Sequence, residues 1–172
     1  SSLVVTQKHF PDPVKEGIRF LFWCLDTDCD EKYDPKTTNT TNVAGLYAAW
    51  GYTVTFDGNG GTPSQQTKDV VYGGRYGELP NVTRTGHTFL GWFDNETNMA
   101  VTEDTVVNIT DNQMLYAQWA INSYKISFVD DGVVVKEDTV KYGEEIIFPS
   151  DPVKEGYNFS RWVPDVTVTD NK

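Results

Sequence analysis

The chain has 172 residues, with 14 basic and 25 acidic side chains and a formal net charge of −11. Such a charge repels nucleic acid and anionic membrane surfaces, so we expect neither as a partner. No apolar run is long enough to insert into a bilayer, and no long stretch places apolar residues at helical spacing. With its frequent aromatic, Val, Thr and Gly residues, the sequence predicts a mostly β protein with little or no helix.

The first fifty residues hold two motifs that recur further along the chain. Asp12–Gly17 is followed at fixed spacing by Phe20 and Trp23, and Leu46–Trp50 closes the segment. From the later copies of both motifs we infer that residues 1–50 are the second half of a repeat.

The two cysteines, Cys24 and Cys29, lie in a segment that we predict to be an exposed loop. A bond between them would close a small loop at a hairpin tip and would suit an oxidising compartment. A pair of free thiols is the alternative. The extracellular character of the remaining sequence favours the disulfide.

Residues 51–120 form a complete repeat, and its first elements are predicted to be a hairpin. Tyr52–Phe56 alternates apolar residues with Thr, as in a strand that has one buried face. Asp57–Pro63 is rich in Gly and Asn, which accept the positive φ of a turn, and Asp69–Tyr72 supplies the returning strand. Any helix would have to be short and lie near Gly77–Leu79.

The second part of this repeat is predicted to contain three more strands. Gly86 is expected to be a turn residue and Asp94–Met99 a polar hairpin tip. The strands are predicted at Phe89–Phe93, Val106–Thr110 and Met114–Trp119. A module of about 70 residues has a thin core, so we expect it to pack against its neighbours.

Residues 121–172 repeat the first part of that module. Asp151–Gly156 copies Asp12–Gly17 letter for letter, and Gly17, Gly86 and Gly156 lie 69 and 70 positions apart. The chain therefore begins and ends inside repeats, as we would expect of a fragment of a longer tandem array.

The linkers between repeats are minimal, because Gly51 directly follows Trp50 and only residues 120–123 separate Trp119 from Tyr124. We therefore expect consecutive modules to be joined semi-rigidly. Aromatic residues recur at fixed positions of the repeat, and we expect them in its core; stacking on a sugar is the alternative. These residues are Phe20, Trp23, Trp50, Phe89, Trp92, Trp119, Phe159 and Trp162.

The complete repeat resembles a known family in five segments taken in order. They are Tyr52–Gly61, Tyr72–Gly73, Leu79–Pro80, Gly86–Trp92 and Leu115–Trp119. In these residues the chain is similar to the Listeria–Bacteroides repeat, the B repeat of internalin-type invasion proteins. The resemblance implies a β-grasp-like module, carried in tandem on secreted or wall-attached bacterial proteins and on related proteins of some parasitic protists. It also implies a role in adhesion and in spacing a binding domain away from the surface.

Residues for catalysis or metal binding are sparse. His9 and His87 occupy unrelated positions of the repeat and belong to no nucleophile, base or metal-ligand spacing. The run from Asp26 to Asp30 resembles the start of a calcium loop, but Glu31 replaces the required Gly and Thr37 the bidentate Glu. We therefore expect no catalytic residue, no metal site, no cofactor and no enzyme activity.

Two functions remain open for a secreted, cell-surface or cell-wall protein of this kind. The first is a stalk or spacer in adhesion, in which the partners of each repeat are its neighbours in the chain. The second is a module that itself binds a host glycan or protein receptor. In that case the variable loops Cys24–Cys29 and Asp94–Met99 would carry specificity.

Overall fold

The computed structural model describes residues 11–36 and 45–163, so His9 and Thr37 lie outside the described residues. Within these ranges the chain forms strands and no helix, which confirms the prediction of a mostly β protein. The strands are β1 (Arg19–Cys24), β2 (Tyr47–Asp57), β3 (Thr62–Pro63), β4 (Thr67–Val71), β5 (Val82–Thr83), β6 (His87–Asp94), β7 (Ala100–Val101), β8 (Gln113–Ile121), β9 (Ser123–Asp130) and β10 (Val133–Lys141).

The chain divides into two compact units. The first unit comprises the described residues up to Val82 together with Gly91–Gln118. The second comprises Thr83–Leu90 together with the described residues from Trp119 onward. β6 and β8 contribute residues to both units.

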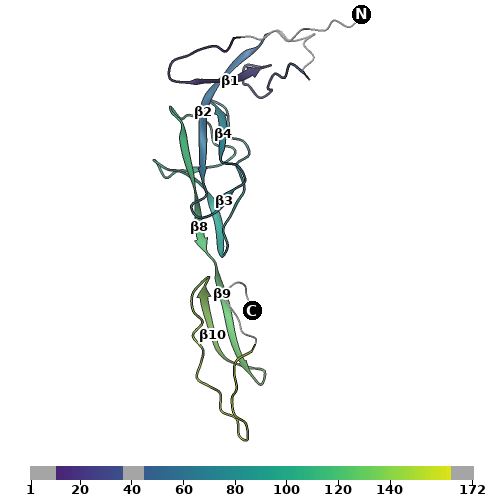
Figure 1. Cartoon of the computed structure of the whole chain (residues 1–172), viewed down its shortest axis with the longest axis vertical. Coiled ribbons are helices and arrows are strands. Elements are labelled where there is room, and N and C mark those ends of the chain that lie inside the picture. The colour runs from purple at the N-terminus through teal and green to yellow at the C-terminus, as the bar shows by residue number, and fades with distance from the viewer. Residues whose placement is uncertain (1–10, 37–44, 164–172) are drawn as a thin grey trace, which may run out of the picture. The chain divides into compact units, whose positions relative to one another are not determined.

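The largest sheet has the strand order β1-β2-β8-β6-β7, with β4 paired to β2. Figure 1 shows β2 between β8 and β4. In the complete repeat, the order β4-β2-β8-β6 puts the first and last long strands side by side in the middle. These two strands run parallel, with Val54 opposite Gln113 and Asp57 opposite Tyr116. This central parallel pair has β4 antiparallel to β2 on one side and β6 beside β8 on the other.

The predicted hairpin is confirmed. β2 carries the expected alternation, with Val54 and Phe56 buried on one face, and it pairs antiparallel with β4 so that Tyr52 lies opposite Val70. The turn after β2 uses Asn59 and Gly60, which have φ of 44° and 90°. Both residue types accept a positive φ at low cost, as predicted.

The strands predicted at Phe89–Phe93 and Met114–Trp119 are confirmed as parts of β6 and β8. The strand predicted at Val106–Thr110 is wrong, because this segment makes only an isolated bridge between Val106 and Arg75. Its neighbour Val107 is fully buried, and its backbone bonds to Gly73 and Gly74 in a glycine-containing turn. Val107 fills the core without joining a ladder, and Val106 beside it is half exposed.

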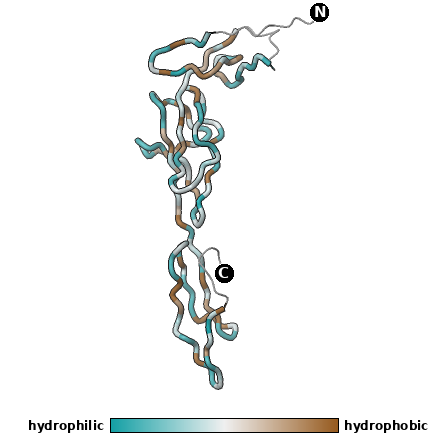
Figure 2. The backbone as a smooth tube through the Cα atoms, viewed as in Figure 1, coloured by the Kyte–Doolittle hydropathy of each residue, from teal (hydrophilic) through white to brown (hydrophobic). Residues whose placement is uncertain are grey.

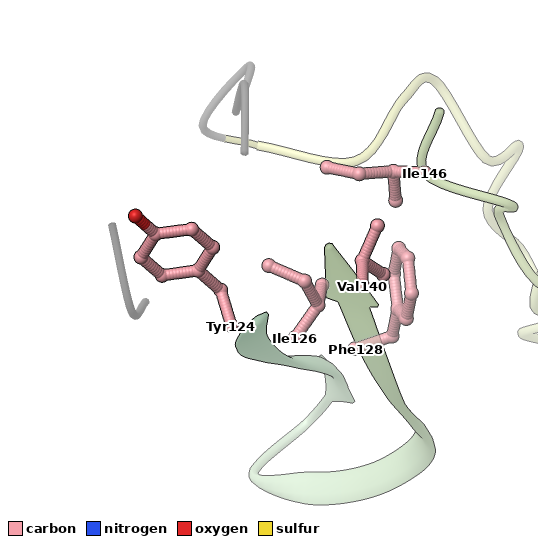
Figure 3. Packing of buried hydrophobic residues seen from close by; sticks show 5 residues of the cluster. All are labelled: Tyr124, Ile126, Phe128, Val140 and Ile146. Carbon is pink, nitrogen blue, oxygen red and sulfur yellow. The ribbon is translucent and has the colours of Figure 1, made fainter. Parts of the chain in front are cut away.

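In the second unit β9 and β10 form an antiparallel hairpin in which Tyr124 lies opposite Val140. Alternate residues of β9 point to one side and meet two residues that follow them in the chain (Figure 3). This cluster consists of Tyr124, Ile126, Phe128, Val140 and Ile146, with Tyr142 and Trp162 packed against it. It is the core of the third repeat.

Apolar and hydrophilic stretches alternate along the backbone of each unit (Figure 2). Among residues 11–36 and 45–163, no helix has the length and apolar character needed to span a membrane.

Candidate functional site at the repeat junctions

The first repeat boundary lies inside a single strand. β2 begins with the closing motif of residues 1–50 and continues without interruption into the first strand of the complete repeat. At the boundary, Gly51 lies opposite Arg19 of β1 and also opposite Val71 of β4. One residue of β2 is thus paired with strands from both repeats.

Gly51 is required at this point by space. A Cβ atom built there would overlap the carbonyl oxygen of Val70 and lie 2.8 Å from Cδ1 of Leu21. Val70 belongs to the complete repeat, and Leu21 belongs to the half-repeat before it. The missing side chain therefore lets the two repeats approach the same segment of β2.

Polar side chains link the same three strands. Arg19 of β1 forms an ion pair with Asp69 of β4, and its guanidinium also donates to Oγ1 of Thr53 at 2.8 Å. The Thr53 hydroxyl in turn donates to Asp69 at 2.9 Å. Both charged side chains are about half exposed, so water weakens the pair and its contribution stays below about 1 kcal/mol.

The aromatic residues of the first half-repeat gather beside this junction. Phe20 contacts Trp23 and Trp50, with ring centroids 5.3 and 6.0 Å apart, and Lys15 places its Nζ 5.8 Å from the Trp50 ring. Tyr72 of the next repeat donates its backbone N–H to the Trp50 carbonyl at 2.8 Å. Trp50 therefore contributes to the repeat boundary as well as to the packing of its own module.

The second boundary, within the second unit, centres on Asn122. Its backbone N–H donates to the Gly86 carbonyl at 2.9 Å, and its carbonyl accepts from the Tyr142 N–H at 2.8 Å. Its side-chain oxygen accepts from the Thr88 hydroxyl at 2.6 Å. Tyr142 is the repeat counterpart of Tyr72, whose N–H donates to the Trp50 carbonyl. At both boundaries this tyrosine N–H therefore bonds to the carbonyl two positions before the opening tyrosine, Tyr52 or Tyr124.

A glycine again provides space at the second boundary. Gly86 has φ of 71°, as expected of a turn glycine, and a Cβ there would overlap the ring of Tyr142. His87 packs on the same ring at 6.4 Å, and Phe89 lies 5.4 Å from Trp119. His87 therefore has a packing role in this structure.

The eight recurring aromatic residues are not equally buried. Trp92 is the one that is fully buried, at 2% exposed. Its ring meets Phe56 edge-on at 5.0 Å, and its Nε1 donates to the Pro80 carbonyl at 3.0 Å. Trp92 therefore offers no face to a sugar. Phe89 is partly exposed at 36%, and the others are intermediate: Phe20, Trp23, Trp50, Trp119, Phe159 and Trp162.

Cys24 and Cys29 are bonded to each other at the end of β1. Cys24 is fully buried, and the Asp26 carboxylate accepts the backbone N–H groups of Asp30 and Glu31, each at 3.1 Å. The Asp26 carboxylate therefore stabilises the loop in which it lies, through these two backbone hydrogen bonds. In the part of the chain that the structure describes, no three His, Cys, Asp or Glu residues group in a way that could hold a metal ion.

The second variable loop is organised by Asp94, which the sequence reasoning did not single out. Its buried carboxylate accepts hydrogen bonds from the N–H and hydroxyl of Thr97, the N–H of Glu96 and the side chain of Gln113. Burial by itself raises the pKa of this carboxyl, but the hydrogen bonds outweigh burial and hold the pKa below its ordinary value. The Asp-x-x-Thr spacing at a hairpin tip is the signal that predicts such a turn.

These features define a tandem-repeat β protein whose small modules share a strand or a short linker at each boundary. The Listeria–Bacteroides repeat domain matches residues 4–49, 52–118 and 124–172. The chain belongs to the Listeria–Bacteroides repeat family, as its motifs indicated.

Three relatives place the family match in longer proteins. A putative membrane protein of Evansella cellulosilytica is 34% identical over 92% of this chain and 24% of its own length. A putative Gly-rich membrane protein of the same bacterium is 33% identical, over 98% of the chain and 20% of its own length. Internalin H of Listeria monocytogenes is 34% identical over 64% of the chain and 20% of its own length.

The chain thus spans between a fifth and a quarter of the length of these relatives. No solved structure matches it.

Proposed function

We propose that this chain is a non-catalytic stalk segment of a secreted or cell-surface protein, which spaces an adhesive domain away from the surface. The membrane-protein and internalin names of the relatives support the location. The observation that carries the proposal is the passage of β2 through the repeat boundary at Gly51. A strand paired on both sides of a boundary resists bending there, which is what a spacer needs.

The second candidate, a module that itself binds a host glycan or protein receptor, has weaker support. Trp92 is one of the aromatic residues whose recurrence suggested sugar stacking. Its ring is buried, and its indole N–H donates to a carbonyl inside the module. The Cys24–Cys29 and Asp94–Met99 loops remain the surfaces that such a receptor would contact.

Stiffness at the first boundary gives a direct test. Spin labels carried by unnatural amino acids at the exposed positions Thr27 and Glu103 report the distance between the half-repeat and the complete repeat. We expect a narrow distance distribution, which a flexible Gly-Ser insertion between Trp50 and Gly51 broadens. The same insertion between Asn95 and Glu96 is the control and should leave it narrow. A broad distribution in the unmodified chain would overturn the stalk proposal.

Binding is tested separately with the immobilised chain. It is screened against a glycan array, extracellular-matrix proteins and host cells, beside an unrelated acidic β protein of matched charge. Saturable binding that is lost on changing either loop would establish the receptor-binding alternative. Absence of binding, combined with a stiff boundary, supports the spacer.

A further inference from the structure

The complete repeat contains a polar hollow beside its short β3–β5 sheet. The hollow has a volume of about 280 Å³, slightly less than the pockets that hold drug-sized molecules, so it has room for one small ligand. Seven residues line it: Ser64, Gln65, Lys68, Glu78, Leu79, Pro80 and Asn81. All of them lie in the first compact unit and within the complete repeat. This repeat therefore forms the hollow by itself.

Hydrogen bonds hold the two walls of the hollow in place. The Ser64 N–H donates to the Asn81 carbonyl at 2.8 Å, which joins the walls directly. The Lys68 ammonium crosses the hollow and donates to the Glu78 carbonyl at 2.6 Å. The buried Trp92 indole donates to the same loop, residues 78–81, at 3.0 Å. The loop is therefore fixed at three points, and the hollow is formed before any ligand arrives.

Several polar side chains of the hollow have bonding capacity that the fold does not use. Within the described residues, the Ser64 hydroxyl, the Glu78 carboxylate and the Asn81 amide make no hydrogen bond to the protein, and all three residues are exposed. Lys68 has three N–H donors and uses one of them on the Glu78 carbonyl. Burial lowers the pKa of Lys68, and the Glu78 carboxylate offsets this only in part. The ammonium has therefore lost water that a ligand oxygen can replace.

The third repeat shows that the fold does not need this polar lining. With Tyr142 aligned to Tyr72, the places of Ser64, Gln65 and Lys68 are taken by Val134, Val135 and Asp138. A lysine still holds the matching loop, because Lys136 donates to the Ile147 carbonyl at 2.6 Å. Both repeats therefore use a lysine of the returning strand to fix the loop, whereas only one of them surrounds that lysine with polar side chains.

The charges in the hollow favour a neutral ligand. Lys68 and Glu78 contribute one charge of each sign, so the hollow as a whole attracts neither an anion nor a cation. The net charge of −11 further disfavours an anion. A ligand with several hydroxyls is suited to the hollow, because each hydroxyl can accept from Lys68 or Asn81 and donate to Glu78. Leu79 and Pro80 add an apolar lining for the C–H groups of the same ligand.

We propose that this hollow binds one neutral saccharide unit, whose hydroxyls bond to Lys68, Glu78 and Asn81. None of the seven lining residues is aromatic, so binding depends on hydrogen bonds without stacking. One sugar ring has about a dozen non-hydrogen atoms, and the usual binding energy per atom then gives a dissociation constant of about 1 to 10 mM. The site lies outside the Cys24–Cys29 and Asp94–Met99 loops and does not depend on the stalk function.

The first experiment is an NMR titration of the isotope-labelled chain with the methyl glycosides of glucose, galactose and mannose. We expect at least one of them to give saturable shifts that are largest at the backbone amides of Ser64, Lys68 and Asn81. Asn81→Ala should weaken this binding by about fivefold, because it removes a hydrogen-bonding amide from the hollow. Asn108→Ala is the matched control, since this exposed asparagine does not line the hollow, and it should leave the affinity unchanged.

Two results of this titration would overturn the proposal. One is the absence of a saturable shift with all three glycosides. The other is an equal effect of Asn81→Ala and Asn108→Ala on the affinity, including shifts that centre on either of the two loops. Asn81→Ala removes a side chain without a protein partner in the described ranges, so the variant should keep its fold, which circular dichroism checks.

The second experiment tests the preference for a neutral ring. The uronic acid form of the bound sugar adds one carboxylate, and it should bind the unmodified chain no more tightly than the neutral form. Glu78→Gln keeps the shape of the side chain and should raise the affinity for the uronic acid about fivefold relative to the neutral sugar, because one repulsive charge is gone. Tighter binding of the uronic acid to the unmodified chain, or the same ratio in Glu78→Gln, would refute the assignment. The stiffness of the first boundary is measured separately, so failure here leaves the stalk proposal standing.

Discussion

Arg19 and Asp69 form an ion pair across the first repeat boundary although fifty positions separate them, and Thr53 bonds to both. Each charged residue comes from a different repeat. A double-mutant cycle with Arg19→Met and Asp69→Asn should give a coupling of about 0.5 kcal/mol, since both side chains are well exposed. Urea unfolding measures it, and at about 1 M salt the coupling should fall toward zero. A coupling that is unaffected by salt would contradict a solvent-screened pair.

Gly51→Ala should destabilise the first unit by about 2 to 3 kcal/mol, because a Cβ at this position overlaps the Val70 carbonyl and crowds Leu21. Gly45→Ala is the matched control, since a Cβ there meets no atom within 4 Å. Urea unfolding followed by tryptophan fluorescence measures both changes. Equal effects at Gly51 and Gly45 would mean that the boundary is loosely packed.

Trp92→Ala should cost about 3 to 5 kcal/mol, because it removes a fully buried ring and leaves the Pro80 carbonyl without its donor. Leu90→Ala removes an exposed side chain and should stay within about 0.5 kcal/mol of the unmodified chain. Thermal unfolding monitored by circular dichroism provides both values. If Trp92→Ala were as mild as Leu90→Ala, the core assignment would have to be abandoned.

The lowered pKa of Asp94 predicts that the folded chain loses stability in acid. Its pKa is lower in the folded chain than in the unfolded one, so the ionised carboxylate stabilises the fold above the unfolded pKa of about 3.9. This stabilisation disappears as the pH falls through the folded pKa. Asp94→Asn should therefore be destabilised at pH 7 and should lose less stability than the unmodified chain between pH 4 and acid unfolding. Urea midpoints measured at each pH test this difference, and parallel pH profiles would contradict it.

Reduction of the Cys24–Cys29 bond should have a modest effect. A closed loop of this length restricts the unfolded chain by about 2 kcal/mol at most, and the Asp26 carboxylate still holds the loop after reduction. Dithiothreitol should therefore lower the urea midpoint slightly and leave the far-ultraviolet circular dichroism unchanged. Asp26→Ala combined with reduction should cost more than either change alone. Collapse of the β signal on reduction alone would show that the bond is needed for folding.

Local sequence patterns predicted the elements that depend on neighbouring residues. The alternation in Tyr52–Phe56 and the Gly- and Asn-rich turn after it were sufficient to place a hairpin. Val106–Thr110 was mistaken for a strand because apolar, β-branched residues that fill a core resemble a strand when no partner is known.

Other features depend on residues far apart in the chain, so no local pattern reports them. The parallel pairing of β2 with β8 joins positions such as Val54 and Gln113. The short β3–β5 sheet and the hydrogen bond from Gln113 to the buried Asp94 likewise join residues that are far apart in the chain. The repeat itself was the strongest signal, since it indicated a shared packing role for the residues around Trp92 before any contact was known.

The parallel pairing of β2 and β8 determines how the complete repeat responds to tension. A force along the chain enters through the N-terminal end of β2 and leaves through the C-terminal end of β8. Because the two strands run in the same direction, these points lie at opposite ends of the pair. The pull therefore shears all the hydrogen bonds between Val54–Asp57 and Gln113–Tyr116 together, which resists rupture better than unzipping them singly. The complete repeat is accordingly loaded in shear, the arrangement of a mechanical clamp.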